Sequence, residues 1–253
     1  MRPVTIGIGS TSDPGCTAIL RFLGNTDGVF LVGAPQGPDK FDIEIYEEGV
    51  PCPRTGYTFH AGREDELVKR ILANHDELSL PLARSFPGFR PAVSQKYIAS
   101  VCKENATFSF VSALPDVVPN IGELLWAFGE FATDTAFLTM NQLKMAFLLA
   151  AANGREVGYR EQKAEVASVI AGAFGWRALA RQMVGKIPFG GGLIPKAAIA
   201  YAGTWVVGQS LERLYSYGAA YNSAEQKSKY KEGLELGKAV AKKLFSNFNR
   251  SAA

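Results

Sequence analysis

Cysteine and histidine are scarce in this 253-residue chain, which has three cysteines, Cys16, Cys52 and Cys102, and two histidines, His60 and His75. The cysteines are far apart and odd in number, so they form neither a disulfide framework nor a zinc-ligand pattern. Neither histidine has a cysteine or acidic partner at ligand spacing. We therefore expect a reduced, cytoplasmic protein that holds no metal, with both histidines at surface or structural positions.

Catalytic motifs are missing as well. The sequence has no GxSxG nucleophile elbow, no HExxH metal motif and no acid pair in a recognisable cleft pattern. The long apolar run of a secretory signal is also missing at Met1–Gly7, which leads directly into an expected strand. The sequence gives no basis for a hydrolase or metalloenzyme, and we expect no cofactor.

No strong charge of one sign marks the chain, but its net charge of +3 is unevenly divided. Residues 1–90 carry nine basic against twelve acidic residues, whereas residues 91–253 carry eighteen against twelve. Opposite charge biases indicate two units with different roles. The basic surplus is too diffuse for a nucleic-acid-binding face, so nucleic acid is not an expected partner.

A small α/β pattern comes first. Apolar and β-branched runs predict four strands and helical periodicity predicts two helices: strands 4–9, 28–33, 41–46 and 57–60, helices 16–23 and 64–75. This order indicates an α/β domain over residues 1–84, and the Pro- and Gly-containing segment 85–92 indicates a linker. Asp42, Glu44 and Tyr46 alternate and are expected on the solvated face of an edge strand, with a metal-holding role for Asp42 as the alternative.

Strand signals then end, and the remaining segments are expected to be helical: 93–113, 121–152, 162–186, 193–217 and 234–248. Asn153-Gly154 is a C-terminal stop for the second of these. Pro- and Gly-rich knuckles at 114–122 and 187–195 break the apolar stretches into two hairpins that resemble each other. Their arms must be buried in a bundle, in a partner or in lipid.

The predicted fold class is therefore α+β, a small α/β domain followed by an all-α helical-hairpin bundle. The bundle is expected over residues 93–218. Residues 219–253 are expected to form a lysine-rich linker, mainly 221–233, and an amphipathic C-terminal helix that places Leu236, Val240, Leu244 and Phe248 at a four-residue spacing.

The loop after the first strand is similar to a degenerate phosphate-binding loop. A P-loop reads GxxxxGK[ST], and its backbone N–H groups and lysine hold phosphate. Here Gly9 and Gly15 are one residue too far apart, and Cys16 stands where lysine is needed. A dinucleotide fingerprint fails because Ser12 occupies its third glycine position. The favoured interpretation is an ordinary strand-to-helix turn; the alternative is a phosphate loop formed by Gly9, Ser10, Gly15 and Thr17.

A polar stripe follows one side of the second bundle helix: Glu123, Glu130, Asp134, Asn141 and Lys144. The third helix places Arg177 and Arg181 on one face. Antiparallel packing would pair these arginines with Glu130 and Asp134, because buried charges must be paired. We favour a network that sets the register of the bundle; the alternative is an anion or proton site.

Charged residues argue against membrane spanning. An arginine or lysine at a helix centre costs about 2.5–3.5 kcal/mol, while a leucine or phenylalanine returns only about 0.3–0.6 kcal/mol. Leu193–Leu211 is the best candidate for a span because Lys196 lies near one end, from which its side chain can reach the membrane surface. Peripheral contact through a hairpin tip or the lysine-rich C-terminal helix is favoured over spanning.

Five segments carry a family resemblance: Lys103–Ala106, Ser112–Pro115, Thr139–Gln142, Gly175–Pro188 and Ala200–Thr204. Over about residues 93–217 the chain resembles a bacterial helical domain of unknown function, often fused to or encoded beside Era-like GTPase domains. The resemblance implies an all-helical module associated with membranes or with a GTPase partner, and it supplies no catalytic residues. It also implies that the N-terminal unit is a shrunken, inactive GTPase relative, or else an unrelated α/β unit, because an NKxD motif is missing.

The leading hypothesis is a non-enzymatic scaffold or adaptor that docks a partner protein or a membrane surface through its helical bundle. Such a protein would be cytoplasmic and peripheral to the inner face of the membrane. The alternatives are a GTPase-associated or degenerate nucleotide-sensing regulator, and a membrane-embedded helical hairpin protein. The sequence leaves the partner and the oligomeric state open.

Overall fold

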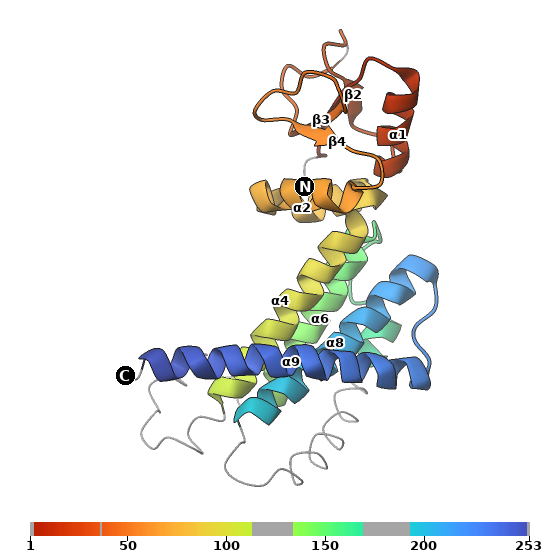
Figure 1. The fold of residues 1–253 in the computed structure, drawn as a ribbon. Helices are drawn as coiled ribbons and strands as arrows, with labels where there is room; N and C mark the ends of the chain where they lie inside the picture. The colour runs from red at the N-terminus through yellow and green to blue at the C-terminus, as the bar shows by residue number, and fades with distance from the viewer. Residues whose placement is uncertain (1–2, 36, 113–133, 169–192, 252–253) are drawn as a thin grey trace. The chain divides into compact units, whose positions relative to one another are not determined.

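The computed structural model describes residues 3–35, 37–112, 134–168 and 193–251 (Figure 1). The chain divides into two compact units. The first comprises residues 1–95 and 150–156, and the second comprises 96–149 and 157–253. A parallel sheet with helices forms the first unit, and most described residues of the second are helical. The predicted α+β fold class is therefore confirmed.

The sheet of the first unit has four strands: β1 (Ile6–Gly9), β2 (Val29–Leu31), β3 (Ile43–Glu47) and β4 (Tyr57–Phe59). Their order is β2-β1-β3-β4, and all neighbouring pairs are parallel. Every residue of β1 is buried, as expected for a central strand covered on both faces.

The third strand differs from the sequence expectation, since β3 lies between β1 and β4 and is not an edge. The Tyr46 side chain is buried rather than solvated. The Asp42 carboxylate accepts hydrogen bonds from the backbone N–H and the hydroxyl of Thr5, at 2.9 and 3.1 Å. The solvated-face interpretation is wrong because an aromatic ring covers this side of the central strands.

The helices of the first unit are α1 (Asp13–Leu23), α2 (Glu64–Asn74) and α3 (Ser79–Ser85), with short 3₁₀ turns η1 (Asp76–Leu78) and η2 (Pro87–Phe89). Helix α1 begins earlier than predicted. The Ser12 hydroxyl caps it by accepting from the Gly15 N–H, and Pro14 lies in the first turn, where a proline is tolerated.

The expected linker 85–92 is part of the folded core. Phe86 and Phe89 are fully buried, and the Phe89 ring lies 5.6 Å from that of Phe22 on α1. Gly88 packs so closely on the Phe22 carbonyl that a side chain there would collide with it. The prolines and glycine do interrupt the helices, but the phenylalanines between them bury this segment against α1.

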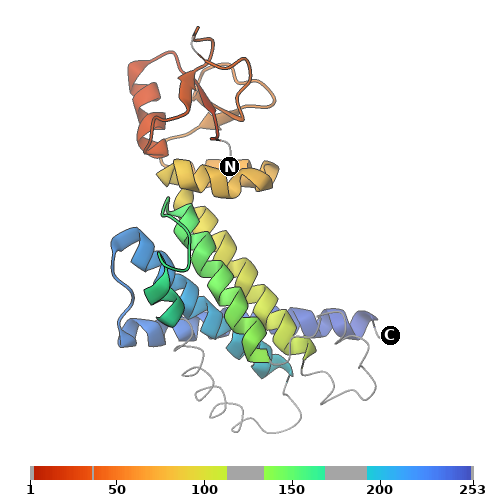
Figure 2. The same ribbon diagram turned by 180° about the vertical axis from the view of Figure 1, so that it is seen from behind.

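The second unit contains α4 (Arg90–Val111), whose first residues belong to the first unit, and α6 (Asp134–Ala152), α8 (Leu193–Tyr217) and α9 (Ser223–Ser251). Helices α4 and α6 lie side by side (Figure 2), and the rings of Phe108 and Phe137 stack between them at 4.0 Å. Gly154 adopts a φ of 72° just after α6, which confirms the predicted stop.

Helix α9 replaces the predicted lysine-rich linker. Asn222 accepts hydrogen bonds from the N–H groups of Ala224 and Glu225, and the Glu225 carboxylate accepts from the Asn222 N–H at 2.8 Å. This reciprocal capping box starts the helix at Ser223. The polar residues after it are the solvent face of a helix rather than a flexible connection.

Helices α8 and α9 cross at very short range (Figure 1). A Cβ atom at Gly233 would lie 2.9 Å from the Trp205 side chain, and one at Gly237 would lie 2.7 Å from the Ala198 carbonyl oxygen. The buried seam of α9 comprises Tyr230, Gly233, Gly237 and Ala241. The prediction that Leu236 belongs to the buried apolar face is therefore wrong, since Leu236 is 40% exposed. Glycines rather than large apolar residues form this part of the contact with α8.

Neither predicted knuckle lies wholly within the described residues. Residues 114–122 and 187–192 lie outside them, and so does most of the predicted helix 162–186. The two-hairpin arrangement and the duplication stay predictions. Within the described parts of the chain, α8 included, no helix is both long and apolar enough to cross a membrane.

Candidate functional site

The candidate phosphate loop is occupied by the chain's own Glu47 carboxylate. Glu47 ends β3, and its Oε2 accepts hydrogen bonds from the Ser10 hydroxyl at 2.7 Å and from the backbone N–H groups of Thr11 and Ser12 at 3.1 and 3.2 Å. Its Oε1 accepts from the Ser12 hydroxyl. The carboxylate therefore lies at the N-terminus of α1, where the helix dipole favours an anion.

These hydrogen bonds, first those from the serine hydroxyls, lower the pKa of Glu47. The side chain is thus held as an anion at the position that a phosphate would take in a P-loop. A phosphate group entering this loop would have to displace a carboxylate of like charge. The arrangement therefore works against nucleotide binding here.

The glycines near the loop have packing roles. A side chain at Gly9 would collide with the Tyr46 ring, and one at Gly15 with the Glu47 carboxyl group. Thr17 is exposed on α1, and its side chain makes no hydrogen bond with a described residue. Of the four predicted phosphate-loop residues, Ser10 alone contributes a side-chain contact to the anion position.

The loop after β1 lies at the topological switch point of the sheet. The chain leaves β1 toward β2 on one side, and β3 lies on the other, so the order reverses between β1 and β3. Ligands of open α/β sheets bind at the carboxyl ends of the strands at such a point. Ser10–Ser12 and Glu47 meet there, and their mutual hydrogen bonds fill the position from within.

A buried amide network connects three helices of the second unit. The Asn141 amide on α6 donates to Asn105 Oδ1 on α4 at 2.8 Å, and the Asn105 amide donates to Thr204 Oγ1 on α8 at 2.8 Å. Gln142 Nε2 donates to the same hydroxyl oxygen at 3.3 Å, and that hydroxyl donates to the Ala200 carbonyl. Asn105 and Thr204 are at most 1% exposed.

This network differs in chemistry from the ionic network predicted from the sequence. Asn141 belongs to it, but its partners are neutral amides and a hydroxyl, and Lys144 is solvent-exposed on α6. Glu130, Arg177 and Arg181 lie outside the described residues, as does the side chain of Asp134. The predicted ion pairs therefore stay a prediction.

Sequence reasoning missed three members of the network, Asn105, Gln142 and Thr204. Their wide separation along the chain gave no sign that they meet. A single polar residue on an otherwise apolar helix face was the available signal, because a buried polar group requires a partner.

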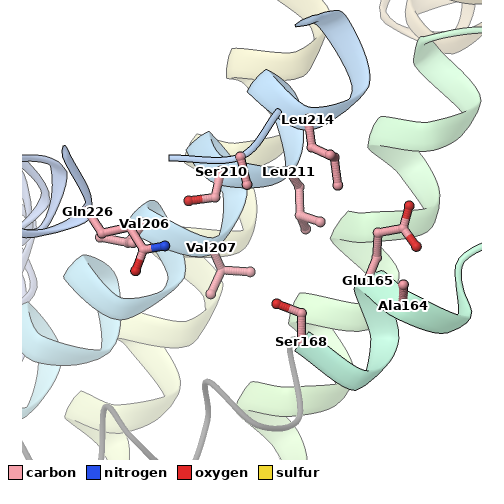
Figure 3. A pocket seen from close by; sticks show the side chains of 10 residues that line it. Ala164, Glu165, Ser168, Val206, Val207, Ser210, Leu211, Leu214 and Gln226 are labelled. Carbon is pink, nitrogen blue, oxygen red and sulfur yellow. The ribbon is translucent and has the colours of Figure 1, made fainter. Parts of the chain in front are cut away.

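A mainly apolar cavity of about 360 Å³ lies between α8, the start of α9 and residues 164–168. In Figure 3, Val207 and Leu211 of α8 lie across from Glu165 and Ser168. The Ser210 hydroxyl also lines it and is buried without a hydrogen-bond partner among the described residues. Ser168 is the last described residue before residue 193.

Helix α9 has two electrostatic halves. Residues 223–235, here called the balanced half, carry three acids and three lysines. Two of these acids, Glu225 and Glu232, pair with Arg213 and Lys229 at 2.6 and 2.8 Å. Residues 236–251, here called the basic segment, carry no acid and four cations: Lys238, Lys242, Lys243 and Arg250.

Lys238 pairs with Glu235 at 2.7 Å, whereas Lys242, Lys243 and Arg250 are exposed and form no ion pair with a described residue. Phe245, 38% exposed, lies on the same side of the helix as Lys242, three residues earlier. Three of the four cations of the basic segment therefore face solvent without a compensating acid among the described residues.

Among the residues that the structure describes, no group of three or more His, Cys, Asp or Glu side chains is placed to hold a metal ion. Comparisons with protein-family models, with curated proteins and with solved structures find no match for this chain.

Proposed function

We propose that this chain is a non-catalytic adaptor whose helical unit docks an anionic partner surface through the basic segment of α9. The supporting observation is the exposed, acid-free run of cations in residues 236–251, of which Lys242, Lys243 and Arg250 have no described ion-pair partner. Uncompensated charge of one sign steers association with surfaces of the opposite sign.

The packing of α9 supports the same proposal. The seam of α9 is bound to α8 through Tyr230, Gly233 and Gly237, so the helix is held on the unit by its apolar side. Its cations then face outward from a fixed support, which lowers the entropy lost on binding. A helix with the same charges but no anchored face would lack this preorganisation.

The test compares two double charge reversals in the full chain within cells. Lys242→Glu/Lys243→Glu removes the docking charges, and Lys227→Glu/Lys231→Glu makes the same change in net charge in the balanced half of α9. After lysis at low ionic strength, the share of the chain in a sedimenting or high-mass pool is measured. We expect the first variant to leave this pool and the control to stay; equal behaviour of both would overturn the proposal.

A further inference from the structure

We infer that the anionic surface docked by the basic segment of α9 is the headgroup layer of a lipid membrane, an inference that rests on the docking function proposed above. The choice between a membrane and an acidic protein depends on the types of residue in the segment, their arrangement around the helix and the depth of the surface.

Residue types favour lipid. Three of the four cations are lysines, which protein–protein interfaces use less than other surfaces do, whereas arginine is enriched there. Lysine is a compact point charge that needs no fixed bidentate geometry. Such charges suit a fluid layer of headgroups better than a rigid arrangement of carboxylates on a protein.

The arrangement around the helix points the same way. Lys242 and Phe245 share one side of α9, and Lys243 and Arg250, seven residues apart, share the other. Cations on both flanks, with the short polar side chain of Ser246 exposed between them, form a broad convex surface rather than a pocket. The cavity of this unit is lined by other residues, none of them in the basic segment.

The other face of α9 sets the mode of binding. Because Gly237 packs on α8 and the Phe248 ring lies 6.4 Å from the Phe110 ring of α4, the apolar side of this segment is already covered and is not available for insertion into the acyl layer. Binding is therefore mainly electrostatic and reversible, with Phe245 as a shallow contact. Each basic residue near an anionic leaflet raises partitioning by roughly fivefold, so three unpaired cations give an effect of about 100-fold.

The test uses the purified full chain and sedimentation with vesicles, either of phosphatidylcholine alone or with about one third phosphatidylglycerol to supply anionic charge. We expect binding only to the anionic vesicles, with loss at high salt because exposed charges are screened. Lys242→Glu/Lys243→Glu should weaken binding by about 25-fold or more, while Lys227→Glu/Lys231→Glu should change it far less. Matching circular dichroism and melting curves of the variants confirm that both fold.

Other results overturn the lipid assignment in distinguishable ways. Retention on immobilised polyglutamate without binding to anionic vesicles would identify an acidic protein as the partner class. If vesicles do not bind, but the bound pool in cells still depends on Lys242 and Lys243, the docking function survives and the lipid inference fails. Equal losses in both charge-reversal variants would show that net charge, not the basic segment, drives binding.

Discussion

Replacement of Thr204 by valine tests the amide network of the second unit most sharply. Valine has almost the shape of threonine and is more apolar, so hydrophobic burial alone predicts a neutral or stabilising change. The Thr204 hydroxyl oxygen, however, accepts from the buried amides of Asn105 and Gln142. Thr204→Val leaves both donors without that acceptor, and each unsatisfied buried donor costs about 1–3 kcal/mol. We expect a net loss of about 2–4 kcal/mol in the free energy of unfolding.

Denaturant unfolding followed by tryptophan fluorescence measures this loss, because residues 1–95 contain no tryptophan. Thr107→Val is the matched control, since the Thr107 hydroxyl makes the same bond to the carbonyl four residues earlier, but on the exposed surface of α4. The control should change stability by less than about 0.5 kcal/mol. If Thr204→Val left the free energy of unfolding unchanged, or if both variants lost the same amount, the amide network would not be a source of stability in the second unit.

Three further predictions concern other elements. The hydrogen bonds of Glu47 lower its native pKa from the ordinary 4.5, so they stabilise the first unit at pH values above 4.5, and this stabilisation is lost as the pH falls through the native pKa. The amide proton shifts of Thr11 and Ser12 should therefore titrate with a midpoint below pH 4.5, and Glu47→Gln should abolish this titration. In an exposed helix, Gly→Ala raises stability by about 1 kcal/mol. At Gly237 the new Cβ would lie 2.7 Å from the Ala198 carbonyl oxygen, so Gly237→Ala should instead lower the melting temperature, and a higher melting temperature would show that α8 and α9 can move apart at little cost. Asn222→Ala should cost about 1 kcal/mol in thermal unfolding by removing the capping box of α9, and an unchanged melting curve would contradict it.

Local patterns predicted most elements of the first unit. Period-two and period-3.6 signals located the four strands and the helices α1 and α2 to within a few residues, because these signals depend on which face of each element is buried. The strand order depends on contacts between distant segments. That is why Tyr46 was expected on a solvated face, although it covers the central strands.

The errors at residues 85–92 and 221–233 have a common cause. Both segments have the composition of connections, one with proline and glycine and the other with lysine and serine. Tertiary contacts decide their structure, through Phe86 and Phe89 in the first segment and through Tyr230 and Gly233 in the second. Composition reports the average solubility of a segment, whereas a few buried side chains fix its conformation.

The loop after β1 could be recognised from the sequence as a poor phosphate site, but not as an occupied one. Cys16 in place of lysine already weakened the nucleotide interpretation. That Glu47, 35 residues after Ser12, provides the anion follows only from the parallel pairing of β1 with β3. The predicted turn and its hydrogen-bonding groups are present, with a ligand supplied by the chain itself.

Site-specific photo-crosslinking in cells tests docking through the basic segment most directly, because it leaves the charges unchanged. Ser246 lies in the basic segment and Ser228 in the balanced half, both exposed and on the same face of α9 because they are about five helical turns apart. A photoreactive residue at position 246 should form crosslinks to the docked surface, and one at position 228 should form few. Equal crosslinking from both positions, or crosslinks from position 228 alone, would contradict the assignment of the basic segment as the docking surface.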